Sequence, residues 1–451
     1  MIHNRMIVYF KNSSYNSFGT NIRVNGRSAM KRKNYWYPVD NAGKIFPAVS
    51  KDSRSSVFRL SFFLIQNIQP ELLEQAVNEV LPRFETFAVE LKSGLFWNYL
   101  SPNKHHFRVK PEPSILCKYV PASKNYGYLF NVYYYKNKIT LETFHSLSDG
   151  TGAMEFLKSI TYHYCRLCGY QLEHEGIIRS NIPFSPKETR DMFCDEYDKS
   201  KKKNLKEEPA YHLTGEKFAD HFSLCIRAQV ETEKLLALTR GLNVTIGEYV
   251  TALLAYSIYT QNVDCRKSKK PIKLFVPVNL RKFFPSNTLR NFSLYIKAVY
   301  DPKLDWTLES MLSETKRQFS EQLNKEDLHG RINSNVWIEK NFFIKILPLP
   351  LKNLGFKLGY YYFAENISTY AISNLGSVSI PEDMKALIKD MEFSIGGTNM
   401  AISSIHSHTN IMLNTERKDL GYISHFIKCL VDSGLKVSID TNYQEGLDEI
   451  L

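Results

Sequence analysis

The sequence predicts an α/β fold built from two halves of similar size. Its 451 residues exceed what a single hydrophobic core usually serves, and its 43% hydrophobic residues can fill more than one core. Strand patterns alternate with helix patterns on both sides of a stretch rich in proline, acidic residues and lysine. We therefore expect domains at residues 34–175 and 216–451, a linker at 176–215 between them, and a basic arm at 1–33 before them.

In the first half, the elements follow from hydrophobic periodicity and from the prolines. An apolar, β-branched and aromatic run at residues 57–65 predicts a strand. Pro70 suits the first turn of a helix, which apolar residues at helical spacing continue until Pro82. Residues 126–144 alternate on both sides of a polar turn and predict a hairpin. A helix with a broad apolar stripe follows directly and ends with Gly169 as its C-cap.

The second half alternates strands and helices in the same way. Residues 223–230 predict a strand, and residues 233–240 predict the helix after it. Thr245, with Glu248 three residues later, is a capping-box signature for the start of another helix. Residues 273–278 then predict a short strand. The similar alternation in both halves supports two α/β halves of similar size.

The charge of the chain is unevenly distributed. The formal net charge is +12, which would favour anionic partners. Residues 1–33 supply seven basic side chains and residues 199–206 supply five lysines, and neither segment has an acidic residue. The surplus therefore lies in the arm and the linker, and does not indicate a nucleic-acid-binding fold. These two segments could touch a membrane surface, a carrier protein or the phosphates of a donor.

The sequence also bears on the compartment. No apolar stretch approaches the roughly 20 residues of a membrane-spanning helix, and the apolar run at residues 6–10 is too short for an export signal. The seven cysteines are an odd number and widely scattered, which suits reduced thiols better than a disulfide framework. We expect a cytoplasmic monomer, with peripheral contact to a membrane left open.

Other signatures in the sequence bear on its function. The patterns G-x-S-x-G, the Walker loop and G-x-G-x-x-G after a strand do not occur, which disfavours a serine hydrolase, a nucleotide kinase and a Rossmann dehydrogenase. Cys165 and Cys168 have no second pair at zinc-ligand spacing and fall in an apolar helix pattern, so we expect packing there and no metal site. His406 and His408 lie in an alternating region, where they would share one face of a strand.

The strongest chemical signal runs from His145 to Gly150. It lies where a strand pattern ends and a helix pattern begins, a junction that presents side chains and helix-terminal N–H groups at an edge. A neutral histidine, with an ordinary pKa of about 6.5, can take a proton from a hydroxyl or an amine near neutral pH. Asp149 lies four residues on, and Gly150 would supply a turn that a side chain would obstruct. His145 is therefore a candidate general base.

A structural interpretation of the same residues stays open. His145 would then be a partly buried histidine with satisfied hydrogen bonds, Asp149 the N-cap of the following helix, and Gly150 an ordinary turn residue. With 12 histidines in the chain, the spacing alone allows a chance match.

Together with other segments, the motif resembles the acyltransferases of the chloramphenicol acetyltransferase and condensation-domain superfamily, and is most similar to their bacterial alcohol acetyltransferase-like branch. The resemblance covers most of the chain, apart from residues 1–33 and the lysine-rich linker. Beside the motif it rests on residues 37–40 (Tyr-Pro-Val-Asp), 46–48 (Phe-Pro-Ala), 81–84 (Leu-Pro-Arg-Phe), 277–281 (Pro-Val-Asn-Leu-Arg), 289–292 (Leu-Arg-Asn-Phe) and 373–376 (Ser-Asn-Leu-Gly). The Asp-Phe-Gly-Trp-Gly signature of the plant branch is absent.

This resemblance implies a V-shaped pair of α/β sandwich domains with a central active-site tunnel. His145, Asp149 and Gly150 would form the catalytic motif, with His145 as the general base that deprotonates the acceptor for direct attack on a thioester. Asp149 would point away from the substrate and pair with an arginine that holds the loop. Arg281 and Arg290 are both candidates for that arginine.

The resemblance also implies the substrates and their contacts. Asn374 and Gly376 would lie close to the tunnel, where the second domain lends a crossover segment, and Arg281 is a further candidate for substrate binding. Acyl-CoA would be the co-substrate, because a free-standing chain needs a diffusible donor, and the acceptor would be a small alcohol or amine. No tightly bound cofactor is expected.

Two alternatives remain. In the first, the donor is an acyl or peptidyl carrier protein, as in lipid or peptide assembly, and a basic docking patch would suit an acidic carrier. In the second, the chain is a basic binding module for nucleic acid or an anionic membrane surface, with an affinity that falls steeply with salt. Acyl transfer should collapse on the substitution His145→Ala, whereas such binding should survive it.

Overall fold

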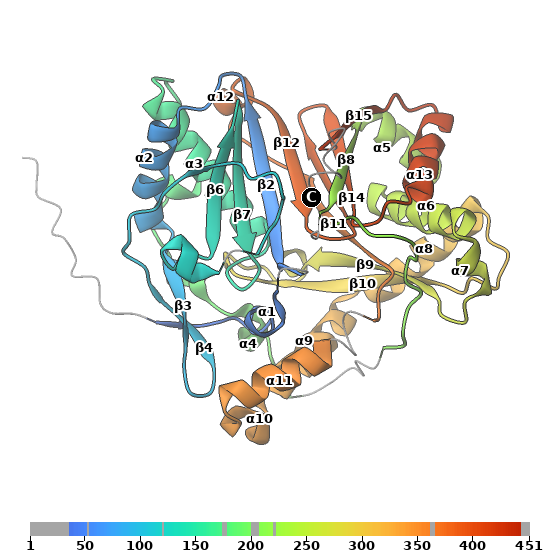
Figure 1. Ribbon diagram of the computed structural model, residues 1–451, viewed down its shortest axis with the longest axis horizontal. Helices are drawn as coiled ribbons and strands as arrows, with labels where there is room; N and C mark the ends of the chain where they lie inside the picture. Colours follow the sequence, from blue (N-terminus) through green and yellow to red (C-terminus); the bar gives the residue numbers. More distant parts are fainter. Residues whose placement is uncertain are drawn as a thin grey trace, which may run out of the picture. The chain divides into compact units, whose positions relative to one another are not determined.

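The computed structural model describes residues 36–51, 54–119, 121–173, 178–199, 207–219, 222–360 and 366–442. The predicted basic arm and most of the lysine-rich run at 199–206 lie outside these residues. Within the described ranges, the strands form sheets of three, five and seven members, and each of the two larger sheets has its own hydrophobic core. Figure 1 shows how these sheets and their helices are arranged.

The five-stranded sheet has the order β12-β2-β7-β6-β5. Neighbours are antiparallel, except for β5 and β6, which run parallel. Because β12 comes from late in the chain, an element of the second half completes the sheet of the first. The strands are β2 (Val57–Leu64), β5 (Lys110–Pro111), β6 (Phe130–Tyr135), β7 (Lys138–Phe144) and β12 (Ile388–Ile395).

The seven-stranded sheet has the order β10-β9-β11-β13-β14-β8-β15. Strand β11 is parallel to both β9 and β13, and the other neighbours are antiparallel. The strands are β8 (Leu224–Glu231), β9 (Ile272–Asn279), β10 (Ser293–Tyr300), β11 (Tyr370–Ser377), β13 (Asn399–Ile405), β14 (His408–Thr415) and β15 (Ser438–Thr441). The small antiparallel sheet is made of β1 (Tyr37–Pro38), β4 (Asn98–Pro102) and β3 (Val89–Ser93).

Helices cover one face of each larger sheet. Helices α2 (Pro70–Val80) and α3 (Gly150–Leu167) pack together beside the five-stranded sheet, and α3 contacts β2 and β7 (Figure 1). On the seven-stranded sheet, α6 (Ile246–Gln261) packs between α8 (Leu308–Gln322) and α13 (Gly421–Asp432). Their apolar faces fill the cores, which bury side chains such as Phe62 and Phe156 on one side and Leu253 and Phe426 on the other.

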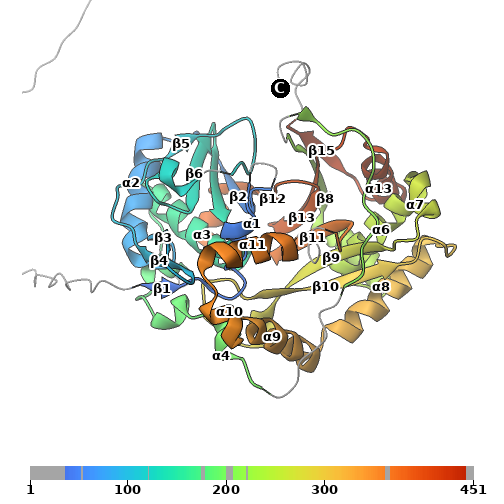
Figure 2. The ribbon, with the colours of Figure 1, turned by 60° about the horizontal axis from the view of Figure 1, so that its bottom comes forward.

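The remaining helices are shorter or lie outside these layers (Figure 2). They are α1 (Phe46–Val49), α4 (Met192–Asp195), α5 (Thr232–Gly241), α7 (Val263–Lys267), α9 (Lys325–Lys340), α10 (Phe342–Ile346), α11 (Leu349–Tyr360) and α12 (Glu382–Lys385). Short 3-10 turns occur at Leu81–Arg83, Ala122–Asn125, Arg179–Asn181, Pro186–Thr189 and Leu280–Lys282. No helix in the described part of the chain combines the length and the apolar character needed to cross a membrane.

The strands and helices expected from the sequence are all present, with most ends shifted by one or two residues; the hairpin expected at 126–144 begins four residues later, at Phe130. The capping box at the start of α6 shows why the local sequence pattern was enough to predict where this helix begins. The hydroxyl of Thr245 accepts from the N–H of Glu248 at 3.2 Å, and the carboxylate of Glu248 accepts from the N–H of Thr245 at 2.7 Å. Both bonds join residues three apart, so they depend on local sequence alone.

Two local expectations were wrong. His406 has a φ of +51° and forms, with Ser407, the turn between β13 and β14, so it does not share a strand face with His408. Cys168, and not Gly169, is the C-cap of α3; Gly169 is the next residue and has the left-handed φ of +93°. In both places one residue has a left-handed φ, which a hydrophobic pattern does not record.

The described part of the predicted linker makes buried contacts. Glu188 is 1% exposed and forms an ion pair with Arg83 at 2.8 Å, and its carbonyl oxygen accepts from the N–H of Leu289 at 2.9 Å. This stretch therefore joins a residue of the first half to one of the second. The domain boundaries proposed from the sequence stay a prediction.

Candidate active site

His145 follows directly on the last residue of β7. Its N–H donates to the carbonyl oxygen of Ser56 at 3.0 Å, which extends the β2–β7 pairing by one residue. The imidazole lies against two phenylalanines: it stacks on Phe46 with ring centroids 5.1 Å apart and is tilted against Phe58 at 4.7 Å. The backbone pairing and the two aromatic contacts hold the ring at the end of the strand.

Burial governs the protonation of this histidine. It lowers the pKa of His145 below the ordinary value of 6.5, while a hydrogen bond with the side chain of Asn291 and the charge of Asp149 act in the opposite direction. Burial disfavours the charged imidazolium because the charge loses its hydration. The imidazole is therefore mainly neutral at neutral pH and can accept a proton.

A chain of buried hydrogen bonds lies behind His145. The side-chain amide of Asn291 donates to the carbonyl oxygen of His145 at 2.7 Å and to the two carboxylate oxygens of Asp40 at 3.2 and 3.1 Å. Asp40 also accepts from the N–H of Gly43 at 2.7 Å and is fully buried. Burial, assisted by the charge of Asp191, raises the pKa of Asp40 to about 7. Asn291 thus links a buried carboxyl group to the residue that carries the imidazole.

Asp149 is both the N-cap of α3 and the partner of an arginine. Its carboxylate accepts from the N–H groups of Gly152 at 3.1 Å and Phe292 at 2.9 Å. The guanidinium of Arg281 completes a two-pronged pair, at 2.8 and 3.3 Å. All four bonds come from protein groups other than His145. The N-cap role and the ion pair, which the sequence offered as alternatives, are therefore combined in one side chain.

Arg281 is the arginine that pairs with Asp149. Its three guanidinium nitrogens all donate to protein oxygens, including the carbonyl oxygens of Thr288 and Arg290. Arg290 instead donates to the carbonyl oxygen of Pro38 at 2.9 Å and is 1% exposed. All of these partners are protein groups, and contact of Arg281 with substrate stays a prediction.

The glycines after Asp149 are needed for close packing. Gly150 is the first residue of α3 and does not supply a turn. A side chain would be obstructed there, as expected, because a Cβ at this position would lie 2.8 Å from the side chain of Leu375. Gly152, which the sequence interpretation left out, is more restricted. Its Cβ would lie 2.2 Å from the carbonyl oxygen of Leu289 and 2.3 Å from the hydroxyl of Ser148. Backbone cannot move aside as a flexible side chain can.

Asn374 and Gly376 lie on β11, at a register shift in its pairing with β13. Gly376 has a φ of +69°, and its N–H donates to the side-chain oxygen of Asn374 at 2.7 Å. Leu375 between them faces Gly150, so this crossover segment does reach the start of α3. Neither Asn374 nor Gly376 is among the described residues that line the cavity beside His145. Their contact with substrate stays a prediction.

A cavity of about 650 Å³ lies beside His145. Both halves of the chain contribute to its walls, since Ser56 and Cys117 meet Gly396 and Asn399 there. Three cationic side chains, Arg54, Lys118 and Lys217, line it; Glu416 is the one acidic residue among its described lining and pairs with Lys217 at 2.9 Å. The cavity thus combines a neutral imidazole with positive charge. The tunnel expected from the resemblance stays a prediction.

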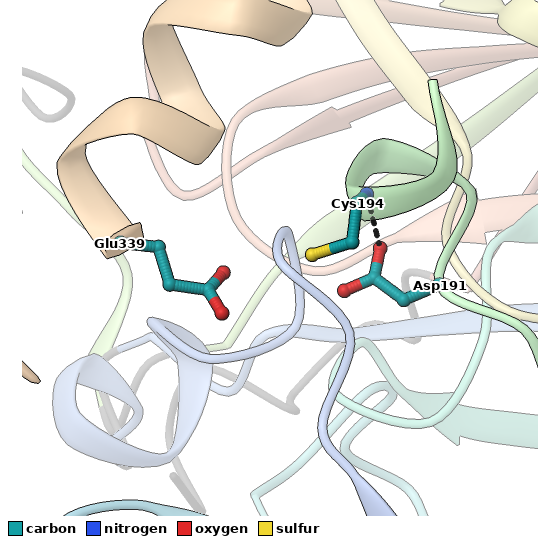
Figure 3. A group of neighbouring side chains, drawn as sticks. All are labelled: Asp191, Cys194 and Glu339. Carbon is teal, nitrogen blue, oxygen red and sulfur yellow. Dashed lines mark hydrogen bonds between the residues drawn. The ribbon is translucent and has the colours of Figure 1, made fainter. Parts of the chain in front are cut away.

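A second cluster of polar side chains, Asp191, Cys194 and Glu339, has atoms close enough to hold a metal ion (Figure 3). Protein donors already satisfy it. Asn41 donates through its N–H to Asp191 at 2.8 Å and through its amide to Glu339 at 2.7 Å, and the ammonium of Lys44 pairs with Glu339. Burial raises the pKa of Cys194 to about 12, which opposes the thiolate that a metal requires. We assign no metal site to it.

The fold, by contrast, has clear counterparts. No family model and no curated protein matches the sequence. Among solved structures, F. graminearum TRI101 in complex with coenzyme A and deoxynivalenol is similar with a TM-score of 0.60 and 9% identity, over 88% of this chain and 97% of that chain. TRI3 trichothecene 15-O-acetyltransferase from Fusarium sporotrichioides gives 0.54 and 10%, over 88% and 94%.

A condensation domain belongs to the same group of neighbours. The starter condensation domain of rhizomide synthetase RzmA, in a mutant form with C8-CoA and Leu-SNAC, gives a TM-score of 0.55 and 11% identity, over 88% of this chain and 94% of that chain. Acetyltransferases and condensation domains therefore share this arrangement of elements over nearly their whole length. The chain has the same α/β fold as these acetyltransferases and this condensation domain, and the sequence predicted an α/β fold.

Proposed function

We propose that this protein is an acyltransferase that moves an acyl group from a coenzyme A thioester to an alcohol or amine, with His145 as general base. The observation that carries the proposal is the position of His145, a neutral imidazole at the end of β7 beside a cavity of about 650 Å³. An imidazole held between two aromatic rings, with its pKa lowered by burial, suits proton transfer at neutral pH.

The reaction needs one proton carrier and no acyl-enzyme. The imidazole takes the proton of the acceptor hydroxyl or amine while its oxygen or nitrogen attacks the thioester carbonyl carbon. The tetrahedral intermediate then collapses, the carbon–sulfur bond breaks, and the imidazolium returns the proton to the departing thiolate. The products are the ester or amide and free coenzyme A, and the histidine is neutral again.

The charge of the cavity supports an anionic donor. Arg54, Lys118 and Lys217 lie on its wall, and Lys217 pairs there with Glu416. Coenzyme A carries phosphates, and cationic side chains stabilise phosphates through charge-assisted hydrogen bonds. Two of the similar structures were solved with coenzyme A or an acyl-CoA bound.

The groups around the motif would position His145. Arg281 holds Asp149 and thereby the start of α3, while Asn291 holds the backbone of His145 itself. Neither is placed to transfer a proton to substrate, so both are positioning residues in this proposal. Asn374 and Gly376 would bound the acceptor side, where their segment meets Gly150.

A thiol-release assay tests the proposal. Purified protein is incubated with several acyl-CoAs and panels of alcohols, amines and glycolipids, and free coenzyme A is measured. We expect His145→Ala to lower kcat by about 10²–10⁴-fold. His408→Ala, at an exposed position at the start of β14, is the matched control and should keep full activity.

The outcomes separate the alternatives. Full turnover by His145→Ala would refute the general-base role. If transfer occurs only from an acyl group loaded on a carrier protein, the donor is the carrier protein and not coenzyme A, and the role proposed for His145 is unchanged. Absence of transfer from any donor, together with unchanged binding of anions by His145→Ala, would favour a binding module.

A further inference from the structure

Helices α10 and α11 present an apolar surface to solvent. Its side chains, called here the α10–α11 face, are each at least half exposed: Phe342 (66%), Phe343 (76%), Ile346 (50%), Leu351 (53%), Leu354 (54%) and Leu358 (53%). The helices lie at the lower edge of the molecule in Figure 1 and come forward in Figure 2. Leu95, in the β3–β4 turn, is 72% exposed and its carbonyl oxygen accepts from the N–H of Leu349, so it extends the face.

The orientation of α11 is the reverse of that of an ordinary surface helix. Leu351, Leu354 and Leu358 are spaced by three and four residues, so they form one stripe, and that stripe points outward. Lys352 points inward and is 3% exposed; its ammonium donates to the carbonyl oxygens of Phe96 and Lys345, at 2.9 and 3.0 Å. Burying a lysine while exposing three leucines costs free energy in water.

Helices α10 and α11 carry charge of one sign. Residues 340–360 contain four lysines and no acidic residue. Lys345 on α10 and Lys357 on α11 are exposed beside the apolar side chains. Aromatic and leucine side chains on one face, flanked by lysines, are the composition of helices that lie in the interface of an anionic bilayer.

We propose that the α10–α11 face docks on an anionic membrane surface, with Phe342 and Phe343 inserted and Lys345 and Lys357 at the level of the headgroups. A bilayer satisfies both properties of the face, since its acyl region takes the apolar side chains and its phosphates pair with the lysines. No spanning helix is required, because these helices would lie along the surface.

Other occupants fit less well. The N-terminal segment 1–33 carries seven basic side chains and no acidic one, so it does not complement a lysine-flanked face. A second copy packed through the same face would place the lysines of one copy near those of the other. An acidic carrier protein would match the charge, but six large exposed apolar side chains exceed what a transient, mainly polar contact requires.

Continuity with the active-site cavity adds weight to the assignment. The last residue of α11, Tyr360, lines the cavity beside His145, and the guanidinium of Arg54 lies 4.3 Å from the centre of its ring. The helix that would touch the membrane therefore ends at the proposed site of chemistry.

Vesicle co-sedimentation tests the proposal without any measurement of activity. The full chain is mixed with vesicles of phosphatidylcholine alone and with vesicles of phosphatidylcholine and phosphatidylglycerol in equal parts, and the bound fraction gives a partition coefficient. We expect binding to the phosphatidylglycerol vesicles, and a loss of about tenfold or more in Phe342→Ser/Phe343→Ser. Lys345→Glu/Lys357→Glu should lose binding at low salt by a similar factor.

The controls decide every outcome. Val263→Ser/Leu304→Ser changes two side chains that are 66% and 55% exposed elsewhere and should bind vesicles as the unchanged protein does. The proposal is overturned if the unchanged protein does not bind the vesicles. It is also overturned if the double phenylalanine variant binds them fully, because the basic segments outside the face would then be what binds the lipid. A dimer that the phenylalanine variant converts to a monomer, seen by light scattering, would assign the face to a second copy.

Discussion

Arg281 and Asp149 are 132 positions apart in the sequence, yet the guanidinium of Arg281 donates two hydrogen bonds to the carboxylate of Asp149, at 2.8 and 3.3 Å. Their side chains are only 11% and 8% exposed. The pair joins the N-terminus of α3 to the turn after β9, and so connects the two halves directly behind the proposed catalytic loop. Removal of either member would leave a buried charge without its partner.

We therefore expect Arg281→Ala to destabilise the protein by about 3–5 kcal/mol, the usual consequence of breaking a buried ion pair. Activity should fall as well, because the loop that carries His145 loses its anchor. Urea unfolding and the thiol-release assay measure the two effects. Lys282→Ala, at the exposed neighbouring position, is the control; equal stability of the two variants would contradict the structural role of the pair.

The pH dependence of kcat/KM should report the imidazole. Burial lowers the pKa of His145 below 6.5, and only the neutral form accepts a proton, so the rate should rise with pH through a pKa below that value and then level off. A midpoint well above 6.5, not attributable to the substrate, would contradict this assignment.

The substitution Asn291→Ala tests whether Asn291 positions His145 for catalysis or only stabilises the fold. The hydrogen bond of Asn291 raises the pKa of His145, so its loss should move the acid limb of the rate profile to lower pH and also reduce kcat. A purely structural effect would lower stability but leave the midpoint unchanged. Asn287→Ala, at an exposed position four residues earlier, should alter neither quantity.

The two glycines of α3 give a matched pair. Gly152→Ala should destabilise the protein by about 3 kcal/mol or more, because its Cβ would meet the carbonyl oxygen of Leu289 at 2.2 Å. Gly150→Ala should cost about 1 kcal/mol or less, since the side chain of Leu375 can rotate away. Thermal unfolding compares them. Gly241→Ala, in α5 with no atom within 4 Å, should instead stabilise the helix slightly.

Because of Asp40, the free energy of unfolding should fall as the pH rises, whereas most carboxylates in folded proteins have the opposite effect. Its pKa is raised from 3.8 to about 7, so between these values the folded protein binds more protons than the unfolded chain. Stability should therefore fall as the pH rises from about 4 to about 7, by up to about 4 kcal/mol from this group. Urea unfolding of Asp40→Asn at about pH 5 and about pH 8 should show a flatter dependence, whereas the exposed Asp264→Asn should match the unchanged protein.

Part of the site could be predicted from the sequence, for a physical reason. The strand before His145 and the helix after Asp149 follow from alternation and helical periodicity, which are properties of neighbouring residues. The junction itself was therefore predictable, together with its possible N-cap. The choice between Arg281 and Arg290 was not, because it depends on how β9 and β10 bring a distant segment to α3.

The sequence did not predict the roles of Asn291 and Gly152. Asn291 stood in a segment already noted for its resemblance, but nothing in its neighbours indicates that its amide reaches His145 and Asp40. Gly152 looks like any small residue in a helix until the carbonyl oxygen of Leu289 is placed against it. Both roles arise from contacts between residues more than a hundred positions apart.

Local periodicity, turns and caps were enough to predict several strands and helices between residues 57 and 278, and the position of His145 at a strand-to-helix junction. Three features depend on contacts made in the folded protein: which arginine anchors Asp149, that Asn291 and the buried Asp40 lie behind the histidine, and that the leucines of α11 face outward while Lys352 is buried. The reason is the same in each case. Hydrogen-bond partners and burial are set by which surfaces the folded chain brings together, and that information is spread over the whole sequence.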